Sequence, residues 1–179
     1  IGPLGGVNYS LSARAGFLRL SGKPDELSFD KPTAFVGRRQ TEPKSVSIAR
    51  LEFDPHVEGE RAGLTVFMSP GYHYDIVKVL LGGKTFIQLV KQVSDMRVVA
   101  VQFPVVSGPL LLRIESDGRH YNFSFSTQQG SWLPLGSGDG QLISSEVADV
   151  WSGAFLGMFS VSPDLGRISP ADFDWFDYQ

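Results

Sequence analysis

The sequence predicts an all-β protein built as an antiparallel sandwich of two sheets. Short apolar, β-prone stretches recur along the whole chain, and turn residues separate them: 20 Gly and 11 Pro occur in 179 residues. Almost no stretch has the period of a helix, and a parallel sheet would need crossover helices. We therefore expect twelve to fourteen strands (roughly, from this spacing) and little else.

In the first half of the chain, each expected strand is an apolar stretch bounded by Gly, Pro or polar turn residues. Val46 and Ile48 share one face of the 44–53 strand, whereas Ala49 and Leu51 lie on the other. This change of phase predicts a bulge or a strand buried on both faces. The strands of this half are expected at residues 9–13, 17–20, 33–40, 44–53, 62–69 and 72–81.

The second half continues with hairpins. Gly82-Gly83 and Asp117-Gly118 supply the positive φ angles of tight turns. The following 119–127 stretch alternates with period two, so one face is expected in the core. Only residues 141–150 resemble a helical turn. The remaining strands are expected at residues 84–93, 95–103, 108–116, 119–127, 131–136, 150–160 and 171–178.

Composition predicts one domain at residues 9–179, after a Gly-rich linker or junction at residues 1–8. The chain starts at Ile1 without an initiator Met, so we expect a processed product or an excised piece. A net charge of −3 with scattered basic residues argues against a nucleic-acid partner. There is no cysteine and no apolar run of the roughly 18 residues that span a membrane, so no membrane partner is expected.

Motifs for catalysis or metal binding are weak. The histidines at 56, 73 and 120 lie in or beside expected turns, without a G-x-S-x-G motif, and are interpreted as exposed surface residues. No cofactor is expected, with one alternative. Asp172 and Asp174 share a face of the last strand, so they could bind a structural calcium ion. Otherwise, one of the two would cap a turn and the other would pair with an arginine.

Aromatic side chains on a rigid β scaffold are typical of carbohydrate binding by stacking. Trp175 alternates with Phe173 and is expected to be buried. Trp151 opens the 150–160 strand after an acidic turn, at a strand end where loops carry binding sites, so it is the best candidate for exposure. The full set of candidates is Tyr72, Tyr74, Trp132, Trp151 and Trp175.

Several segments, taken in order, resemble the C-terminal β-sandwich of family 43 glycoside hydrolases of the β-xylosidase type. The most telling are WSGAFLGM at 151–158 and ADFDWFDY at 171–178. The others are SLSARAGFLRLSG, TAFVGRRQ, LEFDP with EGERAGLTVFMS, and LLLRIESDGRHYNFSFS. The resemblance implies a concanavalin A-like jelly roll, sometimes classed as a xylan-binding module.

The resemblance also implies a role for the chain. In that family a five-bladed propeller carries the catalytic carboxylates, and a Phe on a sandwich loop lines its sugar pocket. That Phe position falls on Trp151 here. Trp in place of Phe is one departure from the family pattern. A second follows Gln40, where this chain has Thr41-Glu42-Pro43 and the family often has an aromatic residue or His. We expect a non-catalytic accessory domain, so this chain alone would not hydrolyse sugars although its full-length parent would be a glycoside hydrolase.

Three alternatives follow for function. The domain supports the propeller, lines its pocket with Trp151 and binds xylan or xylo-oligosaccharide, with Arg39, Gln40 and Tyr72 as polar helpers. Otherwise it is a free-standing lectin-like protein, or a small hydrolase in its own right. The sequons at Asn8 and Asn122 favour a secreted or extracellular protein.

Overall fold

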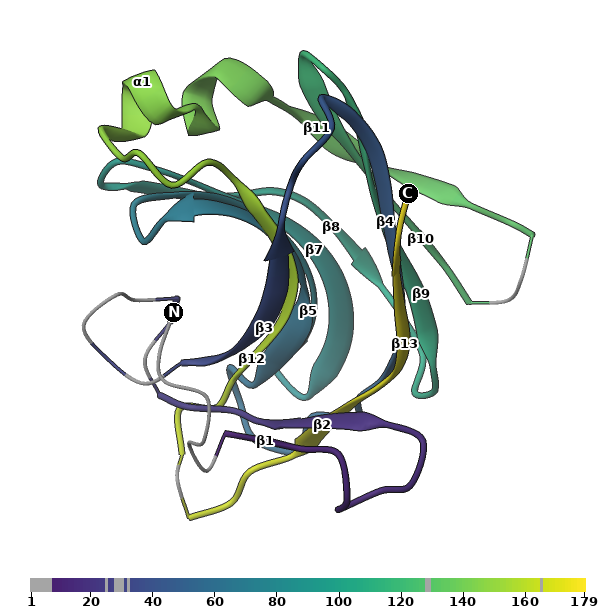
Figure 1. The fold of residues 1–179 in the computed structure, drawn as a ribbon. Coiled ribbons are helices and arrows are strands. Elements are labelled where there is room, and N and C mark those ends of the chain that lie inside the picture. The colour runs from purple at the N-terminus through teal and green to yellow at the C-terminus, as the bar shows by residue number, and fades with distance from the viewer. Residues whose placement is uncertain (1–7, 25, 28–30, 32, 128–129, 165) are drawn as a thin grey trace.

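The computed structural model describes residues 8–24, 26–27, 31, 33–127, 130–164 and 166–179. These residues form two antiparallel sheets that face each other across one core (Figure 1). The predicted antiparallel two-sheet sandwich is therefore confirmed. The linker expected at residues 1–8 lies outside the described residues, apart from Asn8.

The seven-stranded sheet has the last strand of the described chain near its middle, between β2 and β4. Its order across the sheet is β1 (Tyr9–Ser10), β2 (Leu18–Ser21), β13 (Pro170–Tyr178), β4 (Lys44–Glu52), β9 (Leu110–Asp117), β10 (His120–Ser126) and β11 (Leu133–Asp139).

The six-stranded sheet has a similar long-range insertion, because β12 lies between β3 and β5. Its order is β3 (Ala34–Arg39), β12 (Phe155–Val161), β5 (Arg61–Ser69), β6 (Tyr72–Leu81), β7 (Lys84–Val93) and β8 (Met96–Pro104). Two short helices, η1 (Gly140–Ile143) and α1 (Ser145–Ala148), complete the described part. They fall in the stretch that was expected to be helical, and no described helix is long and apolar enough to cross a membrane.

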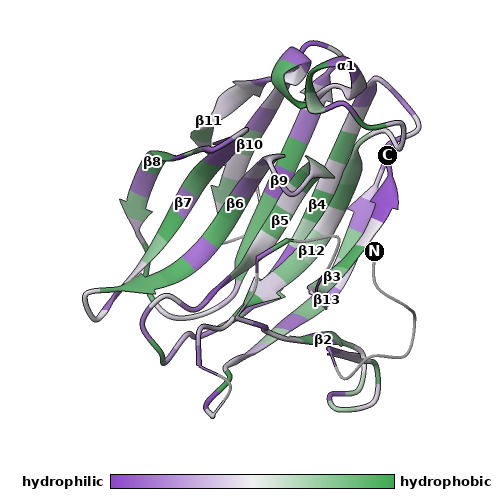
Figure 2. Cartoon of the chain, turned by 90° about the vertical axis from the view of Figure 1, so that its left-hand side faces the viewer, coloured by the Kyte–Doolittle hydropathy of each residue, from purple (hydrophilic) through white to green (hydrophobic). Residues whose placement is uncertain are grey.

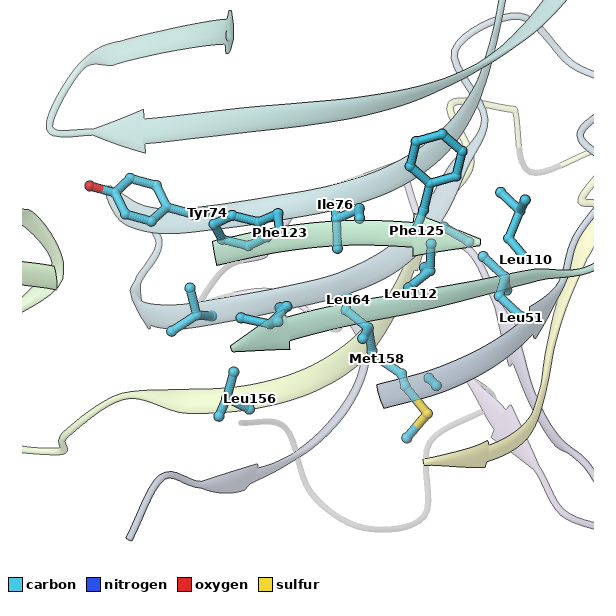
Figure 3. Packing of buried hydrophobic residues seen from close by; sticks show 14 of the residues in the cluster. Leu51, Leu64, Tyr74, Ile76, Leu110, Leu112, Phe123, Phe125, Leu156 and Met158 are labelled. Atoms are coloured by element: carbon cyan, nitrogen blue, oxygen red, sulfur yellow. The ribbon is translucent and has the colours of Figure 1, made fainter. Parts of the chain in front are cut away.

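The core lies between the sheets, where inward side chains from both interdigitate (Figure 3). Tyr74 and Ile76 of β6 face Phe123 of β10, and the rings of Tyr74 and Phe123 meet edge to face with centroids 6.4 Å apart. Such edge-to-face pairs are favoured by the ring quadrupoles. The predicted inward face of β10 is confirmed, since Tyr121 and Phe125 are buried as well.

The outer face of the six-stranded sheet is buried over part of its area. Phe67, Val77 and Val90 form a second apolar cluster there with Phe159 and Leu27. Figure 2 shows this sheet face-on, with hydrophobic and hydrophilic residues alternating along its strands. Because both faces are covered, β5 and β6 are buried along most of their length, and the buried residues of β6 include the polar side chains His73, Asp75 and Lys78.

The bulge or two-sided burial predicted for β4 is absent. Burial alternates regularly along the strand, with Ser45 and Ser47 inward ahead of Ala49 and Leu51. The strand also pairs with β9 in one unbroken register. Two serines on the core face make the hydrophobic pattern change phase while the backbone does not.

A bulge does occur next to β4, but β13 contains it. The register between these strands shifts between Phe173 and Trp175. The extra residue, Asp174, reverses the alternation that follows it. Phe173 is buried, whereas Trp175 is 39% exposed. The expectation of a buried Trp175 was therefore wrong.

Candidate functional site

Trp151 lies in a loop at one end of the sandwich and is completely exposed. We define the Trp151 loop as residues 149–154, between α1 and β12. The expected exposure is confirmed. The expectation that Trp151 opens a strand was wrong, because β12 begins only at Phe155.

The backbone of the loop explains why Trp151 points away from the core. Asp149 and Gly153, on either side of it, have left-handed conformations with φ of 50° and 71°. Val150 and Ala154 are partly buried and pack against the core. The chain therefore packs against the core on both sides of Trp151 and turns sharply at Asp149 and Gly153, which leaves the indole in solvent.

Strand β12 is anchored in the core by one of its two faces. Met158 lies on that face and is 5% exposed. Leu156 is the second core residue of β12, while Phe155 is only partly buried and lies on the other face of the strand. The side chains of β12 alternate, so residues 155 and 158 cannot share a face.

Two more apolar side chains are exposed on the segment that precedes the loop. Leu142 of η1 is 42% exposed and Val147 of α1 is 43% exposed. None of the α1 residues is buried. Large apolar side chains gathered on a surface segment often mark a contact site, because their exposure to water is unfavourable.

A cleft of about 870 Å³ lies at the same end of the sandwich. Its volume is in the range of small-ligand sites. The turn after β3, the β9–β10 hairpin and the η1–α1 segment form its walls. Ala154 of the Trp151 loop lines it, whereas Trp151 itself does not. The polar lining residues include Gln40, Glu42, Arg119, His120, Asp139 and Glu146.

Gln40 is one of the predicted polar helpers, and its side-chain amide is already engaged within the protein. Its Oε1 accepts a 2.6 Å hydrogen bond from the phenol of Tyr121. Its Nε2 donates to the carbonyl oxygen of Glu42 at 2.9 Å and to Ser45 Oγ at 3.3 Å. Since both N–H donors are used, a sugar would have to compete with these contacts.

The other two helpers lie at the same end of the six-stranded sheet. Arg39 ends β3 opposite Phe155, and its guanidinium lies 5.6 Å from the Phe155 ring centroid. Tyr72 opens β6, two strands away from β12, and is partly buried against the core. Neither residue lines the cleft. The structure thus brings Arg39 and Gln40 close to the Trp151 loop, with Tyr72 farther along the sheet end.

The remaining stacking candidates are less available. Tyr74 is fully buried in the core. The guanidinium of Arg113 lies 4.3 Å from the ring centroid of Trp132, so it covers one face of that ring. Trp175 has partial exposure. Trp151 is the most exposed of the five.

Asp172 and Asp174, the calcium alternative, both contact arginines. Asp172 accepts from Arg19 at 2.7 and 2.8 Å and from Arg14 at 3.1 Å. Asp174 accepts from Arg50 at 2.8 Å. Within the described residues, no group of three or more His, Cys, Asp and Glu side chains is placed to hold a metal ion. Both carboxylates are therefore paired with arginines, from β2, from the β1–β2 connection and from β4.

The expectation for His73 was wrong. It is 2% exposed, and its Nδ1 lies 2.9 Å from Asp75 Oδ1 on the outer face of the six-stranded sheet. Residues 73 and 75 share a strand face, so the carboxylate satisfies the buried imidazole. His56 and His120 are exposed, as expected.

The arrangement that comes nearest to a hydrolytic triad surrounds Glu60, which the sequence analysis did not single out. His56 Nδ1 lies 3.2 Å from Ser169 Oγ, and this hydroxyl donates to Glu60 Oε2 at 2.5 Å. In a triad the acid orients the histidine and the serine faces substrate. Here the serine is 5% exposed and faces the acid. The cluster is a single buried carboxylate, that of Glu60, surrounded by hydrogen-bond donors.

Comparison with known protein families gives the identity of the domain. Residues 4–179 match the family model of the β-xylosidase C-terminal concanavalin A-like domain of family 43 glycoside hydrolases.

The chain belongs to this family.

Related proteins match this family 43 sandwich over only part of their own length. It is 31% identical over 173 residues to a non-reducing end alpha-L-arabinofuranosidase of Bacteroides ovatus, covering 96% of this chain and 32% of that protein. It is 28% identical to a xylan 1,3-beta-xylosidase of a Vibrio species, again covering 32% of the relative. The chain thus spans about a third of these proteins, as an accessory domain does.

Solved structures of family 43 proteins contain the same fold over about a third of their length. A Bacteroides ovatus family 43 protein of a xyloglucan locus superposes with a TM-score of 0.88 at 30% identity, covering 96% of this chain and 34% of that one. The Bacillus licheniformis family 43 protein BlXynB gives 0.86 at 26% identity, with the same coverage of both chains. The predicted family and the concanavalin A-like fold are confirmed.

Proposed function

We propose that this sandwich is a non-catalytic partner of a family 43 catalytic domain and contributes Trp151 to that domain's sugar pocket. The observation that carries the proposal is a fully exposed tryptophan on a loop fixed by two left-handed residues. A tryptophan buries roughly 150–250 Å² when covered. At about 25 cal/mol per Å², covering it would contribute roughly 4–6 kcal/mol.

The proposed partner is a five-bladed propeller that carries the catalytic carboxylates. The relatives support this, because the family 43 sandwich accounts for only about a third of their length. Leu142 and Val147, exposed on the segment that precedes the Trp151 loop, would be covered in the same contact. The parent enzyme would release xylose or arabinose from xylan-type polysaccharides, as the names of the relatives suggest.

The test is the full-length parent enzyme with Trp151→Ala. We expect kcat/KM on aryl xylosides or arabinofuranosides to fall at least tenfold, and Trp151→Phe to retain most of it, because a ring still fills the position. Trp175→Ala is the matched control, since Trp175 is an exposed tryptophan on β13, in the other sheet. Wild-type kinetics in Trp151→Ala would refute the pocket role.

The chain is also proposed to bind xylan or xylo-oligosaccharide by itself, by stacking on Trp151 with Arg39, Gln40 and Tyr72 nearby. What supports this is the fully exposed Trp151 indole, at the same end of the sandwich as a cleft of about 870 Å³ that Gln40 and Ala154 line. Titration of the chain with xylohexaose and a pull-down on insoluble xylan test it. Binding that Trp151→Ala removes is the expected result, and the absence of binding by the folded chain would leave only the role beside the propeller.

A free-standing lectin-like protein is the second candidate, and the same cleft favours it. A gene that encodes a catalytic propeller directly upstream of residue 1 would exclude this candidate. For either function, secretion is proposed, because polymeric xylan is met outside the cell. Recovery of the mature protein from the periplasm or the culture medium, and not from the cytoplasm, is the result expected.

A further inference from the structure

We propose that Gln40 is a positioning residue, which holds the Trp151 loop in place through a hydrogen-bonded brace across the end of the sandwich. The inference rests on the proposed function only for its effect on catalysis. The side-chain amide of Gln40 makes its hydrogen bonds within the protein, which suits a positioning role.

The first part of the brace is a backbone link to the loop. The last residue pair between β3 and β12 joins Arg39 and Phe155. One residue further, the Gln40 N–H donates to the carbonyl oxygen of Ala154 at 2.9 Å. This bond extends the ladder into the Trp151 loop. Ala154 is three residues from Trp151, and Gly153 lies between them, so the position of Ala154 determines where the loop leaves the sheet.

The second part ties Gln40 to the opposite sheet. Its Oε1 accepts from Tyr121 of β10 at 2.6 Å, and its Nε2 donates to Ser45 of β4 at 3.3 Å. Burial raises the pKa of Tyr121 to about 12, above its already high ordinary value, so the phenol is a hydrogen-bond donor across the neutral and mildly alkaline range. Gln40 therefore connects the ends of both sheets. Its backbone bond to Ala154 restrains the start of the Trp151 loop relative to both of them.

The third part fixes the turn that follows Gln40. The phenol oxygen of Tyr178 in β13 accepts from the N–H groups of Thr41 and Glu42 at 3.0 and 3.3 Å. The guanidinium of Arg38 lies 4.0 Å from the Tyr178 ring centroid. Segment 38–42 is thus held on both sides of Gln40, which prevents the turn from moving away with the loop.

The test uses the chain with Trp132→Phe and Trp175→Phe, so that Trp151 is the only tryptophan. Gln40→Met keeps the shape of the side chain but removes its polar groups, and Tyr121→Phe removes the donor while keeping the buried ring. We expect both variants to lower the fluorescence anisotropy of Trp151 and to speed hydrogen exchange in the loop at least tenfold. Combining the two should add little, because they break the same bond.

Gln92→Leu is the matched control. The Gln92 Nε2 donates to the Ser94 carbonyl oxygen at 2.7 Å in the β7–β8 turn, so its loss removes a comparable bond that is not part of the brace. Anisotropy and loop exchange should stay unchanged in this variant. Unchanged loop exchange and anisotropy in both folded variants, Gln40→Met and Tyr121→Phe, would overturn the proposal.

Kinetics of the full-length enzyme separate the two proposals. Gln40→Met should reduce kcat/KM in the wild-type background but not in the Trp151→Ala background. If Trp151→Ala leaves kinetics unchanged while Gln40→Met still loosens the loop, the brace stands and the pocket role fails. A reduction of the same size in both backgrounds would show that Gln40 acts without Trp151 and would overturn the brace.

Discussion

The hydroxyl of Ser169 donates a 2.5 Å hydrogen bond to the buried carboxylate of Glu60, and this contact joins the loop after β12 to the turn before β5. Glu60 is 1% exposed. It also accepts from the N–H of Ser169 at 2.7 Å, from Ser162 Oγ at 3.0 Å, and from the N–H groups of His56 and Val57 at 3.0 and 3.1 Å. One ionised side chain therefore holds two connections together, the one between β4 and β5 and the one between β12 and β13.

Glu60→Gln should destabilise the chain by roughly 2–4 kcal/mol at pH 7, because an amide cannot accept all five bonds. Desolvation raises the pKa of Glu60, but the bonds from Ser169, His56 and Val57 outweigh it and lower the pKa below its usual value. The ionised form is thus favoured by folding. Its stabilisation is complete above the ordinary glutamate pKa and is lost as pH falls through the lowered, folded-state value.

Urea unfolding at pH 7 and at about pH 3 measures this difference. The stability gap between wild type and Glu60→Gln should narrow at the lower pH, since only the wild type loses the ionised carboxylate. A gap that stays constant over this range would contradict the assignment.

Asp172→Asn should cost roughly 1–3 kcal/mol, because its almost buried side chain accepts from Arg19 and Arg14. Desolvation raises its pKa, and the two arginines more than offset this, so the pKa of Asp172 is lowered. Its stabilisation is therefore also lost as pH falls.

Because arginines already satisfy the carboxylate of Asp172, EDTA should leave the Tm of the chain unchanged. A Tm that rises by several degrees with millimolar calcium would revive the calcium alternative.

Gly63→Ala should prevent stable folding or cost more than about 3 kcal/mol. A Cβ at residue 63 would lie 1.9 Å from the carbonyl oxygen of Ile76 on the neighbouring strand. Gly83→Ala is the control, because a Cβ there meets open space and only the left-handed φ of 71° is unfavourable, which costs about 1–2 kcal/mol. Circular dichroism melts of both variants compare the two effects. Equal melting temperatures would contradict the close approach.

Trp151→Ala should leave the Tm of the chain within about 2 °C of wild type, since a fully exposed side chain contributes little to folding. Phe123→Ala is the contrast, because this ring is 1% exposed and its loss should cost roughly 3–5 kcal/mol. Calorimetry of the two variants measures both. A clear drop in the Tm of Trp151→Ala would mean that the indole packs on the chain itself.

Most strands were predictable because turn chemistry and period-two patterns are local properties. The Gly82-Gly83 turn is an example: both residues have positive φ, and β6 and β7 pair up to it. Strand β4 was misinterpreted because the sequence does not say that its inward residues begin with two serines. Trp175 was misassigned for a related reason, since a bulge in β13 depends on the neighbouring strand.

The site was predictable only in part. Trp151 could be found because it follows a turn-like stretch and precedes an apolar strand. The role of Glu60 could not be predicted, since the groups that donate to its side chain lie both before and after it in the sequence, up to 109 residues away. His73 was misjudged for the same reason, as its burial depends on what covers the outer face of the sheet. The contacts of Gln40 likewise join strands that are distant in sequence.

The positions of β12 and β13 determine when this chain can fold during synthesis. Strand β12 separates β3 from β5, and β13 separates β2 from β4. A nascent chain that has emerged only as far as α1 therefore holds both sheets in two unconnected parts, with open strand edges between them. We therefore expect neither sheet to be completed before β12 and β13 leave the ribosome, and a ribosome stalled before β12 to leave apolar strand faces accessible to chaperones and proteases.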